Sequence, residues 1–475
     1  MSFKSNDLGI VWFRNDLRVL DNKALYHALD HHSKGVLAVF CICEQQWKSH
    51  GVGLPKINFM IRQLVDLQRS LKELNVNLMV FDSEDFNKSI KDVLKFAITS
   101  NVKRVYYNKE IEYNERKRDR VFDERAKLEG LEISSFQDSC ILSPQSLKTQ
   151  QGTPYKVFTP FKKNWLATVE KNGIITLPKP KKLDSAIGKV KNIQTYVNRF
   201  KLENAYWKVG EKFALAQLEN FISKDVESYH LNRDFPSLNN TSHLSPYLAS
   251  GVLSARVCYS KVQKVLGLNK NCAEGVLTWC SEIIWREFYR HLLVDFPRLS
   301  RGRAFKLSTE SLNWRRNDAD LEKWKEGRTG IPIIDASMRQ LKEINWMHNR
   351  LRMVVSMFLT KNLRMHWSLG EEHFSKNLVD YDLAANNGGW QWSASTGCDA
   401  VPYFRVFNPI SQSIRFDKNA DFIKEYVPEL RNIPNKDCHE PFSKRISIQG
   451  LDYPKPLVDL KMSRLKAIEM FKKGS

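Results

Sequence analysis

The chain has 475 residues, of which 42% are hydrophobic, which is enough to bury substantial cores in about two to four domains. It carries 74 lysine and arginine residues against 53 aspartate and glutamate residues, a formal net charge of +21. This surplus favours a polyanionic partner such as nucleic acid, although charge alone indicates no reaction. No apolar run approaches the roughly 20 residues of a membrane helix, and the polar N-terminus, Met1 to Leu8, has no apolar signal region. We therefore expect a cytoplasmic protein with no signal peptide.

The first third of the chain alternates between strand and helix patterns. Apolar runs at residues 9–13, 36–43, 77–81 and 104–107 have the length of buried strands, and apolar residues recur at helical spacing over 57–74 and 86–97. This alternation predicts a Rossmann-like α/β domain over residues 1–136, with a parallel sheet covered on both faces. The loop after the first strand, residues 14–18, has no glycine, so the usual backbone cradle for a dinucleotide is not expected there.

Residues 137–205 differ in composition from what precedes them. Lysine, proline, glutamine, serine and threonine dominate, as in residues 178–182, which indicates a long surface connector. Helical periodicity then prevails, so we expect an all-helical domain over residues 206–475.

The eight cysteines form no metal-binding pattern. None is paired as Cys-x-x-Cys, and none lies beside a spaced pair of histidines, so we expect no metal site. Scattered cysteines of this kind are usually reduced and packed as small core residues. They are Cys41, Cys43, Cys140, Cys258, Cys272, Cys280, Cys398 and Cys438.

The helical half is rich in tryptophan, with eight of the twelve tryptophans between Trp279 and Trp392. Trp279, Glu282 and Arg286 are spaced to share one helix face. A carboxylate beside indole rings is costly unless it is hydrogen-bonded, so Glu282 is a candidate acceptor for a heterocyclic ligand. The alternatives are a tryptophan-rich core and an intrahelical pair between Glu282 and Arg286.

Two further segments combine polar groups with large apolar side chains. Asn349, Arg352 and Met353 share one helix face, and the amide suits the edge of a base. Residues 380–392 hold two acids, two asparagines, two glycines and two tryptophans, an unusual polar density for a core. Residues 241–246 predict either a simple helix cap or a phosphate site. These patterns predict a basic, tryptophan-lined pocket for a flat heterocycle, but no reaction.

Three longer runs resemble sequence signatures of the photolyase/cryptochrome family. They are residues 11–18 followed by Asp21 and Asn22, residues 345–353, and residues 380–395. The resemblance extends along nearly the whole chain. Within the family, the sequence is most similar to the class I bacterial photolyases that act on cyclobutane pyrimidine dimers. Members of this group take a damaged base out of the duplex.

The resemblance implies that the helical domain binds FAD in a folded conformation. Arg352 and Asp380 would form a buried pair near the isoalloxazine ring, and Asn386 would face flavin N5. The implied FAD-binding residues are Tyr229, Thr241, Ser242, His243, Leu244, Ser245, Trp279, Arg286, Arg352, Asp380, Tyr381, Asp382 and Asn386.

The resemblance also implies a light-driven reaction in which excited, reduced anionic FAD donates an electron to a flipped-out dimer. The catalytic positions would be Glu282, Trp285, Asn349, Met353, Asn386 and Trp392. Electrons that reduce oxidised FAD would pass through Trp314, Trp367 and Trp390. The positions implied to contact DNA are Arg233, Glu282, Trp285, Asn349, Arg350 and Gln412. The partner would be double- or single-stranded DNA that contains pyrimidine dimers, bound without sequence specificity by a monomer.

A second chromophore is expected in the sheet domain. His50, Asn114 and Glu115 match positions of folate-binding relatives, which implies 5,10-methenyltetrahydrofolate as the antenna. Ser300 and Arg301 depart from the cysteine and lysine of some such relatives, and a deazaflavin is the rival.

Two other functions remain open at this level. A cryptochrome-type light sensor is the first, although signalling members often have long C-terminal tails and this chain ends at Ser475. Met353 and Trp392 also favour cyclobutane-dimer repair. The second is a basic DNA-binding module that catalyses no reaction, but such a module does not account for the polar and tryptophan-rich cluster at residues 380–392.

Overall fold

The structure is a computed structural model that describes residues 7–188, 192–268, 273–443 and 450–473. The chain divides into two compact units, which we describe separately. The first unit comprises Met1–Glu227 and Ser242–Pro297, and the second comprises Ser228–Thr241 and Arg298–Ser475. The predicted domain limits at residues 136 and 205 both fall within the first unit.

The first unit contains a five-stranded, fully parallel sheet with the order β3-β2-β1-β4-β5. Every residue of β2 is buried, as its continuous apolar sequence predicts for a strand covered on both faces. The predicted parallel α/β arrangement is therefore confirmed. The strands are β1 (Leu8–Phe13), β2 (Gly35–Ile42), β3 (Asn77–Asp82), β4 (Val102–Lys109) and β5 (Glu132–Gln137).

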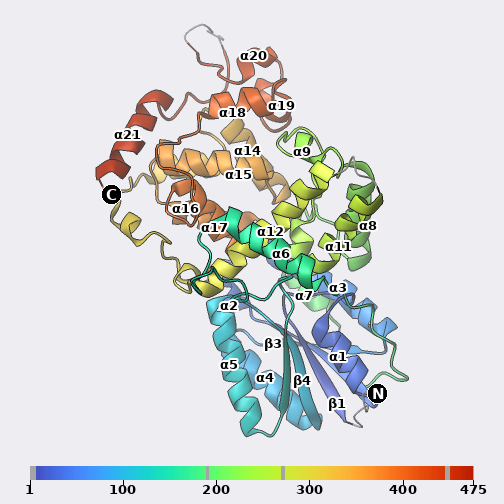
Figure 1. Cartoon of the computed structure of the whole chain (residues 1–475). Coiled ribbons are helices and arrows are strands. Elements are labelled where there is room, and N and C mark those ends of the chain that lie inside the picture. Colours follow the sequence, from blue (N-terminus) through green and yellow to red (C-terminus); the bar gives the residue numbers. More distant parts are fainter. Residues whose placement is uncertain (1–6, 189–191, 269–272, 444–449, 474–475) are drawn as a thin grey trace. The chain divides into compact units, whose positions relative to one another are not determined.

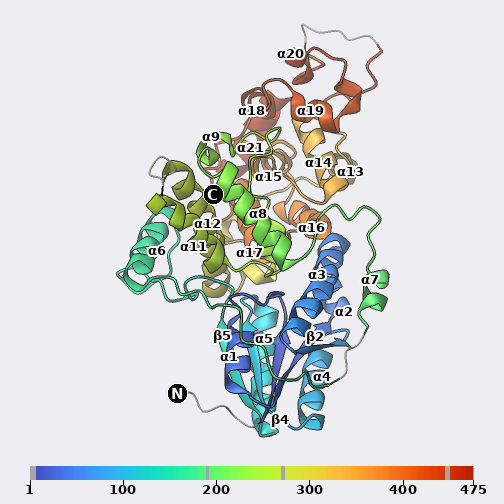
Figure 2. The ribbon, with the colours of Figure 1, turned by 90° about the vertical axis from the view of Figure 1, so that its right-hand side faces the viewer.

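Helices cover both faces of this sheet (Figure 1; Figure 2). Side chains of α4 and α5 share one hydrophobic cluster with Ile10, Trp12 and Val39, whereas right-handed crossovers place α1 and α3 on the opposite face. The strand order reverses between β1 and β4, which is where doubly wound sheets usually bind ligands. The helices are α1 (Lys23–His31), α2 (Glu44–Ser49), α3 (Leu54–Glu73), α4 (Phe86–Thr99) and α5 (Tyr113–Leu128).

The predicted connector contains a helix, α6 (Phe158–Asn172), that the sequence analysis did not predict. It buries Phe158, Phe161 and Trp165 and packs against α12, so this segment is more than a surface loop. Trp165 donates its indole N–H to the fully buried Glu287 of α12 at 2.7 Å. The other helices after the sheet in this unit are α7 (Gln194–Arg199), α8 (Glu211–Lys224), α10 (Ser245–Ala249), α11 (Ala255–Leu268) and α12 (Ala273–Asp295).

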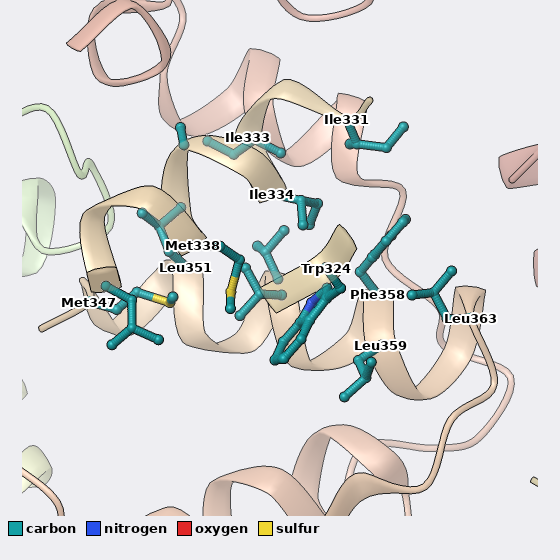
Figure 3. Close-up of a cluster of buried hydrophobic side chains, with 14 of the residues drawn as sticks. Trp324, Ile331, Ile333, Ile334, Met338, Met347, Leu351, Phe358, Leu359 and Leu363 are labelled. Atoms are coloured by element: carbon teal, nitrogen blue, oxygen red, sulfur yellow. The ribbon is translucent and has the colours of Figure 1, made fainter. Parts of the chain in front are cut away.

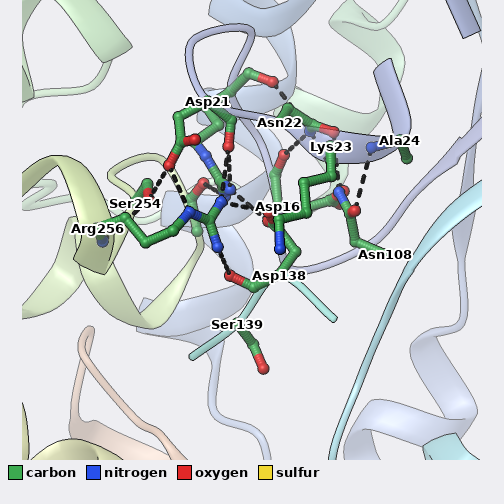
Figure 4. Close-up of polar contacts among 12 residues, drawn as sticks. Asp16, Asp21, Asn22, Lys23, Ala24, Asn108, Asp138, Ser139, Ser254 and Arg256 are labelled. Carbon is green, nitrogen blue, oxygen red and sulfur yellow. Dashed lines mark hydrogen bonds and ion pairs between the residues drawn. The ribbon is translucent and has the colours of Figure 1, made fainter. Parts of the chain in front are cut away.

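A buried ionic network ties the loop after β1 to the segments that precede α6 and begin α11 (Figure 4). Arg256 donates to Asp21 at 2.9 Å and to Asp138 at 2.5 Å, and Arg18 also pairs with Asp138. Burial alone would raise the pKa of Asp138, but the two guanidinium groups outweigh it and hold that pKa below its ordinary value. Arg18 and Asp21 of the N-terminal signature therefore have a structural role in this unit.

The second unit is helical, as predicted for this part of the chain. A large hydrophobic cluster fills it, in which Trp324 lies among Ile334, Phe358 and Leu359 (Figure 3). Its α-helices are α9 (Tyr229–Asn232), α13 (Asp318–Lys325), α14 (Pro332–Ile344), α15 (Asn349–Met357), α16 (Trp367–Asn377), α17 (Leu383–Ala394), α18 (Pro409–Phe416), α19 (Asp421–Tyr426), α20 (Asn435–Cys438) and α21 (Leu460–Lys473). Short 3-10 helices span Leu299–Arg301, Leu307–Ser311 and Pro428–Leu430, and a π-helical turn spans Phe358–Asn362.

A fully buried lysine, Lys361, lies in the π-helical turn. Its ammonium group donates to the Ser395 hydroxyl at 2.7 Å and the Ala394 carbonyl at 3.4 Å, at the C-terminus of α17. It also lies 3.8 Å from the ring centre of Phe471 in α21. Burial, together with the charge of Lys306, lowers the pKa of Lys361 from 10.5 to about 7.

We expect Lys361→Met to change how stability depends on pH. Between pH 7 and 10.5 the unfolded chain keeps a proton that folded Lys361 releases. The contribution of this group to the free energy of unfolding therefore increases as pH rises and decreases as pH falls. Each unit of pKa difference corresponds to about 1.4 kcal/mol. Urea unfolding at pH 7 and pH 9 should therefore show the wild type gaining stability relative to the variant. Parallel pH curves for the two proteins would contradict this assignment.

Candidate functional site

A buried carboxylate, Asp380, lies just before α17 in the second unit. Its Oδ2 accepts a hydrogen bond from Arg352 Nη2 at 2.7 Å, and Arg352 Nε donates to the Met347 carbonyl at 2.8 Å. The predicted pair between Arg352 and Asp380 is therefore present. The side chain of Asp380 is only 2% exposed, yet its Oδ1 has no hydrogen-bond partner among the described residues. A buried, unpartnered carboxylate oxygen is costly, so this atom is suited to accept from a ligand N–H or O–H.

The first turn of α17 orients Asn386. Asp382 caps this helix by accepting from the Ala385 N–H at 3.0 Å. Asn386 then donates its amide nitrogen to the Glu371 carbonyl of α16 at 3.0 Å. Because the amide nitrogen donates to a backbone carbonyl, the amide oxygen is the atom that can accept a hydrogen bond from a ligand.

Glu371, which was not predicted, lies beside these asparagines, and its carboxylate accepts from Asn387 at 2.9 Å. Burial raises the pKa of Glu371 to about 7, although the bond from Asn387 acts in the opposite direction. The residue contacts two successive asparagines of α17 because α16 and α17 pack together. No local pattern marks it, since it lies 15 residues before Asn386 in a helix with ordinary amphipathic character.

The three tryptophans of the predicted electron path lie in or against one hydrophobic cluster of the second unit. Trp390 and Trp367 are 2% and 1% exposed, and Trp314 is half-buried. Trp367 lies against the ring of His366, 5.3 Å between centroids, and Trp314 lies 5.4 Å from the same ring. His366, which was not predicted, therefore bridges two members of the predicted path.

Trp390 is enclosed by other side chains of the same cluster. Phe374 and Trp324 lie 5.0 and 6.0 Å from it, both edge-to-face. A Cβ at Gly370 would lie 2.0 Å from the Trp390 ring, so this position requires glycine. The Trp390 position is therefore tightly defined by packing.

Two of the predicted DNA contacts, Arg233 and Arg350, share one carboxylate. Arg350 donates to Asp234 at 2.7 Å, and Arg233 lies 3.9 Å from the same residue. Arg350 also lies over the ring of Phe416, 4.5 Å from its centre, on the helix that carries Gln412. The structure thus brings Arg233, Arg350 and the α18 helix together, with Asn349 exposed and Met353 and Trp392 partly buried.

Helix α12 of the first unit carries four of the predicted residues. Glu282, Trp285 and Arg286 are half-buried, whereas Trp279 is 3% exposed and lies 5.6 Å from Phe221 of α8. Arg286 donates to the carbonyls of Ser139 and Leu248 at 3.0 and 3.4 Å. These bonds fix the guanidinium group by contacts outside its own helix.

The predicted segment from Tyr229 to Ser245 crosses from the second unit to the first. Tyr229 is buried beneath Arg233, and the Thr241 hydroxyl is buried with no hydrogen-bond partner in the described part of the chain. Ser242 offers its carbonyl to Gln217 at 3.5 Å. His243 has a left-handed φ of 50°, and burial lowers its pKa. Leu244 is buried and Ser245, which begins α10, is exposed.

The three predicted antenna residues lie together in the first unit. His50 Nδ1 is 3.4 Å from Glu115 Oε1, and the amide nitrogens of Asn114 and Gln46 lie 2.9 and 2.8 Å from His50 Nε2. Phe86 packs edge-on against the imidazole at 5.7 Å. Gln46 and Phe86 were not predicted.

The described residues contain no group of three or more His, Cys, Asp or Glu side chains placed to hold a metal ion. The seven described cysteines are buried and form no disulfide with one another, and Cys272 lies outside the described residues, as do Met1 to Asn6 of the predicted polar N-terminus. None of the helices in the described ranges is both long and apolar enough to cross a membrane.

Comparisons with known proteins identify the family. Residues 9–182 match the family described as DNA photolyase, and residues 279–473 match the FAD binding domain of DNA photolyase. The chain is 42% identical to a protein of Buchnera aphidicola subsp. Acyrthosiphon pisum named deoxyribodipyrimidine photo-lyase, over 98% of this chain and 97% of that one. The chain belongs to the photolyase/cryptochrome family. The resemblance inferred from the sequence signatures is thereby confirmed.

Solved structures of the photolyase/cryptochrome family share the whole fold. A bacterial class III photolyase from Agrobacterium tumefaciens is 30% identical with a TM-score of 0.88, covering 100% of this chain and 98% of that one. A cryptochrome from Synechocystis is 26% identical with a TM-score of 0.85, covering 99% and 100%. Because both classes match over full length, the fold alone does not separate repair from light sensing.

The residues present fit the FAD that the family match indicates. Asp380 Oδ1 and the Thr241 hydroxyl, which have no hydrogen-bond partner within the described ranges, can each bond to a polar ligand atom. Arg352 adds a guanidinium group that is 27% exposed beside Asp380. These donors and acceptors suit a flavin and its phosphates.

Proposed function

We propose that this protein is a light-driven DNA repair enzyme, a deoxyribodipyrimidine photo-lyase that splits cyclobutane pyrimidine dimers. The observation that carries the proposal is its near-full-length similarity to a relative that bears this name. The positive net charge suits a DNA partner, to which phosphate contacts would bind without reading base sequence. We propose that it acts as a monomer in the cytoplasm on double- or single-stranded DNA.

FAD, when bound and reduced, supplies an excited-state electron that opens the cyclobutane ring and is then returned. Asp380, Arg352 and Asn386 would hold the flavin, and Thr241 would contribute on the phosphate side. Tyr229, Ser242 to Ser245, Trp279, Arg286, Tyr381 and Asp382 complete the proposed set. The backbone bond that fixes the Asn386 amide directs its oxygen, which suits the proposed place opposite flavin N5.

The substrate would be a dimer rotated out of the helix. Trp285 and Trp392 would stack on its pyrimidine rings, because base–aromatic stacking tolerates any base. Glu282 and Asn349 would bond to the pyrimidine edges, with Met353 as an adaptable wall. Arg233, Arg350 and Gln412 would position the DNA backbone. The shared carboxylate of Asp234 would preorganise both arginines.

Trp390, Trp367 and Trp314 would carry electrons to oxidised FAD. Trp390 and Trp367 are enclosed in one hydrophobic cluster and Trp314 packs against it, which supports this role because rigid surroundings fix the separation between rings. His366, between Trp367 and Trp314, would hold the outer part of the path in place.

We propose 5,10-methenyltetrahydrofolate as the antenna, held by His50, Asn114 and Glu115. The rival deazaflavin would need space where doubly wound sheets bind flat ligands, beside the ends of β1 and β4. Buried ion pairs lie at these strand ends: Arg14, which follows β1, donates to Asp119 at 2.9 Å, and Arg118 pairs with Asp119 at 2.7 Å and with Glu110, which follows β4, at 2.8 Å. Arg14, Arg118 and Asp119 are each at most 7% exposed.

The test of this function is repair of a thymine-dimer oligonucleotide by the reduced holoenzyme under blue or near-ultraviolet light. We expect restoration of the thymines in light and none in a dark control. A cryptochrome-type sensor, which the similarity to the Synechocystis protein favours as the second candidate, would bind FAD but leave the dimers unchanged.

Glu282→Ala should lower the yield of repair more than the affinity for dimer-containing DNA. A bond that strengthens as negative charge develops on the pyrimidine contributes mainly to the chemical step. We expect a loss of about tenfold or more in repair, with binding changed by less than about threefold. Yield per bound dimer and dark affinity measure the two effects separately. Equal losses would refute this role for Glu282.

A further inference from the structure

A phenylalanine of the connector lies flat against Trp285 in the first unit. The ring centres of Phe158 and Trp285 are 3.6 Å apart, and their planes differ by only 9°. Phe158 is 8% exposed, so its ring is committed to this contact, whereas Trp285 remains partly exposed. One face of Trp285 is therefore covered by the protein itself.

Helix α6 holds Phe158 in this position through contacts with α12. Trp165 donates its indole N–H to Glu287 at 2.7 Å. Lys162 donates to the Ser281 hydroxyl at 2.6 Å. Glu287 also accepts the backbone N–H groups of Ile141 and Leu142, so it joins the start of the connector to α12 as well. The placement of the Phe158 ring thus depends on a buried, hydrogen-bonded helix pair.

Two neighbours on α12 restrict Trp285 further. Phe288 lies edge-on at 5.7 Å, and Tyr289 lies at 5.6 Å with a tilt of 33°. A half-exposed tryptophan without such neighbours would sample several rotamers, and ordering it on binding would cost free energy. Contact with three rings removes most of this freedom before any ligand arrives.

We infer that Phe158 is a positioning residue that preorganises Trp285 as a platform for an extruded pyrimidine. It covers one indole face and leaves the other to stack on the flat ring of the lesion. The inference rests on the proposed function and adds a residue that recognises damage without touching the substrate. It would contribute to the binding of flipped-out lesions and not to the binding of DNA as such, because phosphate contacts do not depend on an extruded base.

The test compares Phe158→Leu and Phe158→Met with Phe158→Tyr in the reduced holoenzyme. Dark affinity is measured for two oligonucleotides of the same sequence, one with a thymine dimer and one undamaged. We expect Leu and Met to weaken dimer binding about tenfold, since stacking of one base is worth roughly that or more. Affinity for undamaged DNA and repair per bound dimer should change less than about twofold, and Tyr, which keeps the flat ring, should restore dimer binding.

Phe161→Leu is the matched control, because it removes a buried ring from the same helix without touching Trp285. We expect it to lower the unfolding temperature as Phe158→Leu does while preserving discrimination between the two oligonucleotides. The inference is overturned if Phe158→Leu and Phe158→Met discriminate as well as wild type, if they lose affinity for both oligonucleotides equally, or if Phe161→Leu gives the same loss. A wild-type enzyme that repairs no dimers would instead overturn the proposed function, whatever the Phe158 variants do.

Discussion

Trp390→Phe is expected to abolish light-driven reduction of oxidised FAD while the pre-reduced enzyme still repairs dimers. Trp390 is 2% exposed, and the substitution keeps an apolar ring in its place against Phe374 and Trp324. The indole is the readily oxidised part of the side chain, so phenylalanine interrupts electron supply without emptying the site. The absorbance of oxidised FAD under illumination with an external reductant measures the first effect. Repair after chemical reduction measures the second.

Trp346→Phe provides a control for the loss of a buried indole. Trp346 is 7% exposed in the same unit but belongs to no predicted electron path. It should leave photoreduction at the wild-type rate. The proposed role of Trp390 fails if its variant photoreduces normally, or if the variant cannot repair even after chemical reduction.

Asp380→Asn should greatly weaken the retention of FAD. The substitution keeps the size of the side chain but removes the charge that pairs with Arg352 at 2.7 Å. Asp380 Oδ1, which has no hydrogen-bond partner among the described residues, would also lose its charge-assisted bond to FAD, and such a bond is worth about 1.5–3 kcal/mol, or roughly tenfold or more in affinity. The measurement is FAD released per protein after purification, followed by titration of the stripped protein with FAD.

Asp417→Asn is the control variant, because it replaces another buried carboxylate of the same unit and shows what that change does to stability alone. Asp417 is 2% exposed and accepts the N–H groups of Phe422 and Ile423, both at 3.0 Å, at the start of α19. Burial raises its pKa to about 6, so its replacement also removes a partly charged buried group near neutral pH. This variant should lose stability yet keep a full complement of FAD. Equal FAD content in the Asp380 and Asp417 variants would contradict the role of Asp380.

The sheet was predictable where burial dominates the sequence. Strand β2 is buried throughout and therefore continuously apolar, which makes it visible without tertiary information. Strand β5, at the edge of the sheet, has the polar sequence Glu-Ile-Ser-Ser-Phe-Gln and is only partly buried, so its pattern resembled a loop. Helix α5 was missed because charged residues obscure its few buried positions.

The sequence signatures predicted one contact within the candidate site, but not the residues that support it. Arg352 and Asp380 were expected as a pair, and the structure places them in contact. Phe158 and Glu371 were missed, because each acts through a helix pair that forms only on folding. Asp234 is a further case, since its two arginine partners are 1 and 116 residues away. Such long-range partners leave no periodic signal in a single sequence.

The most direct test of the central claim counts dimers repaired per bound FAD. Reduced holoenzyme is given an excess of dimer-containing oligonucleotide, without oxygen or any external reductant, and is illuminated continuously. Because the donated electron is returned, we predict that many dimers are repaired per FAD and that the FAD is still reduced at the end. Repair that stops at one dimer per FAD as oxidised FAD accumulates, or that proceeds equally in the dark, would contradict the account.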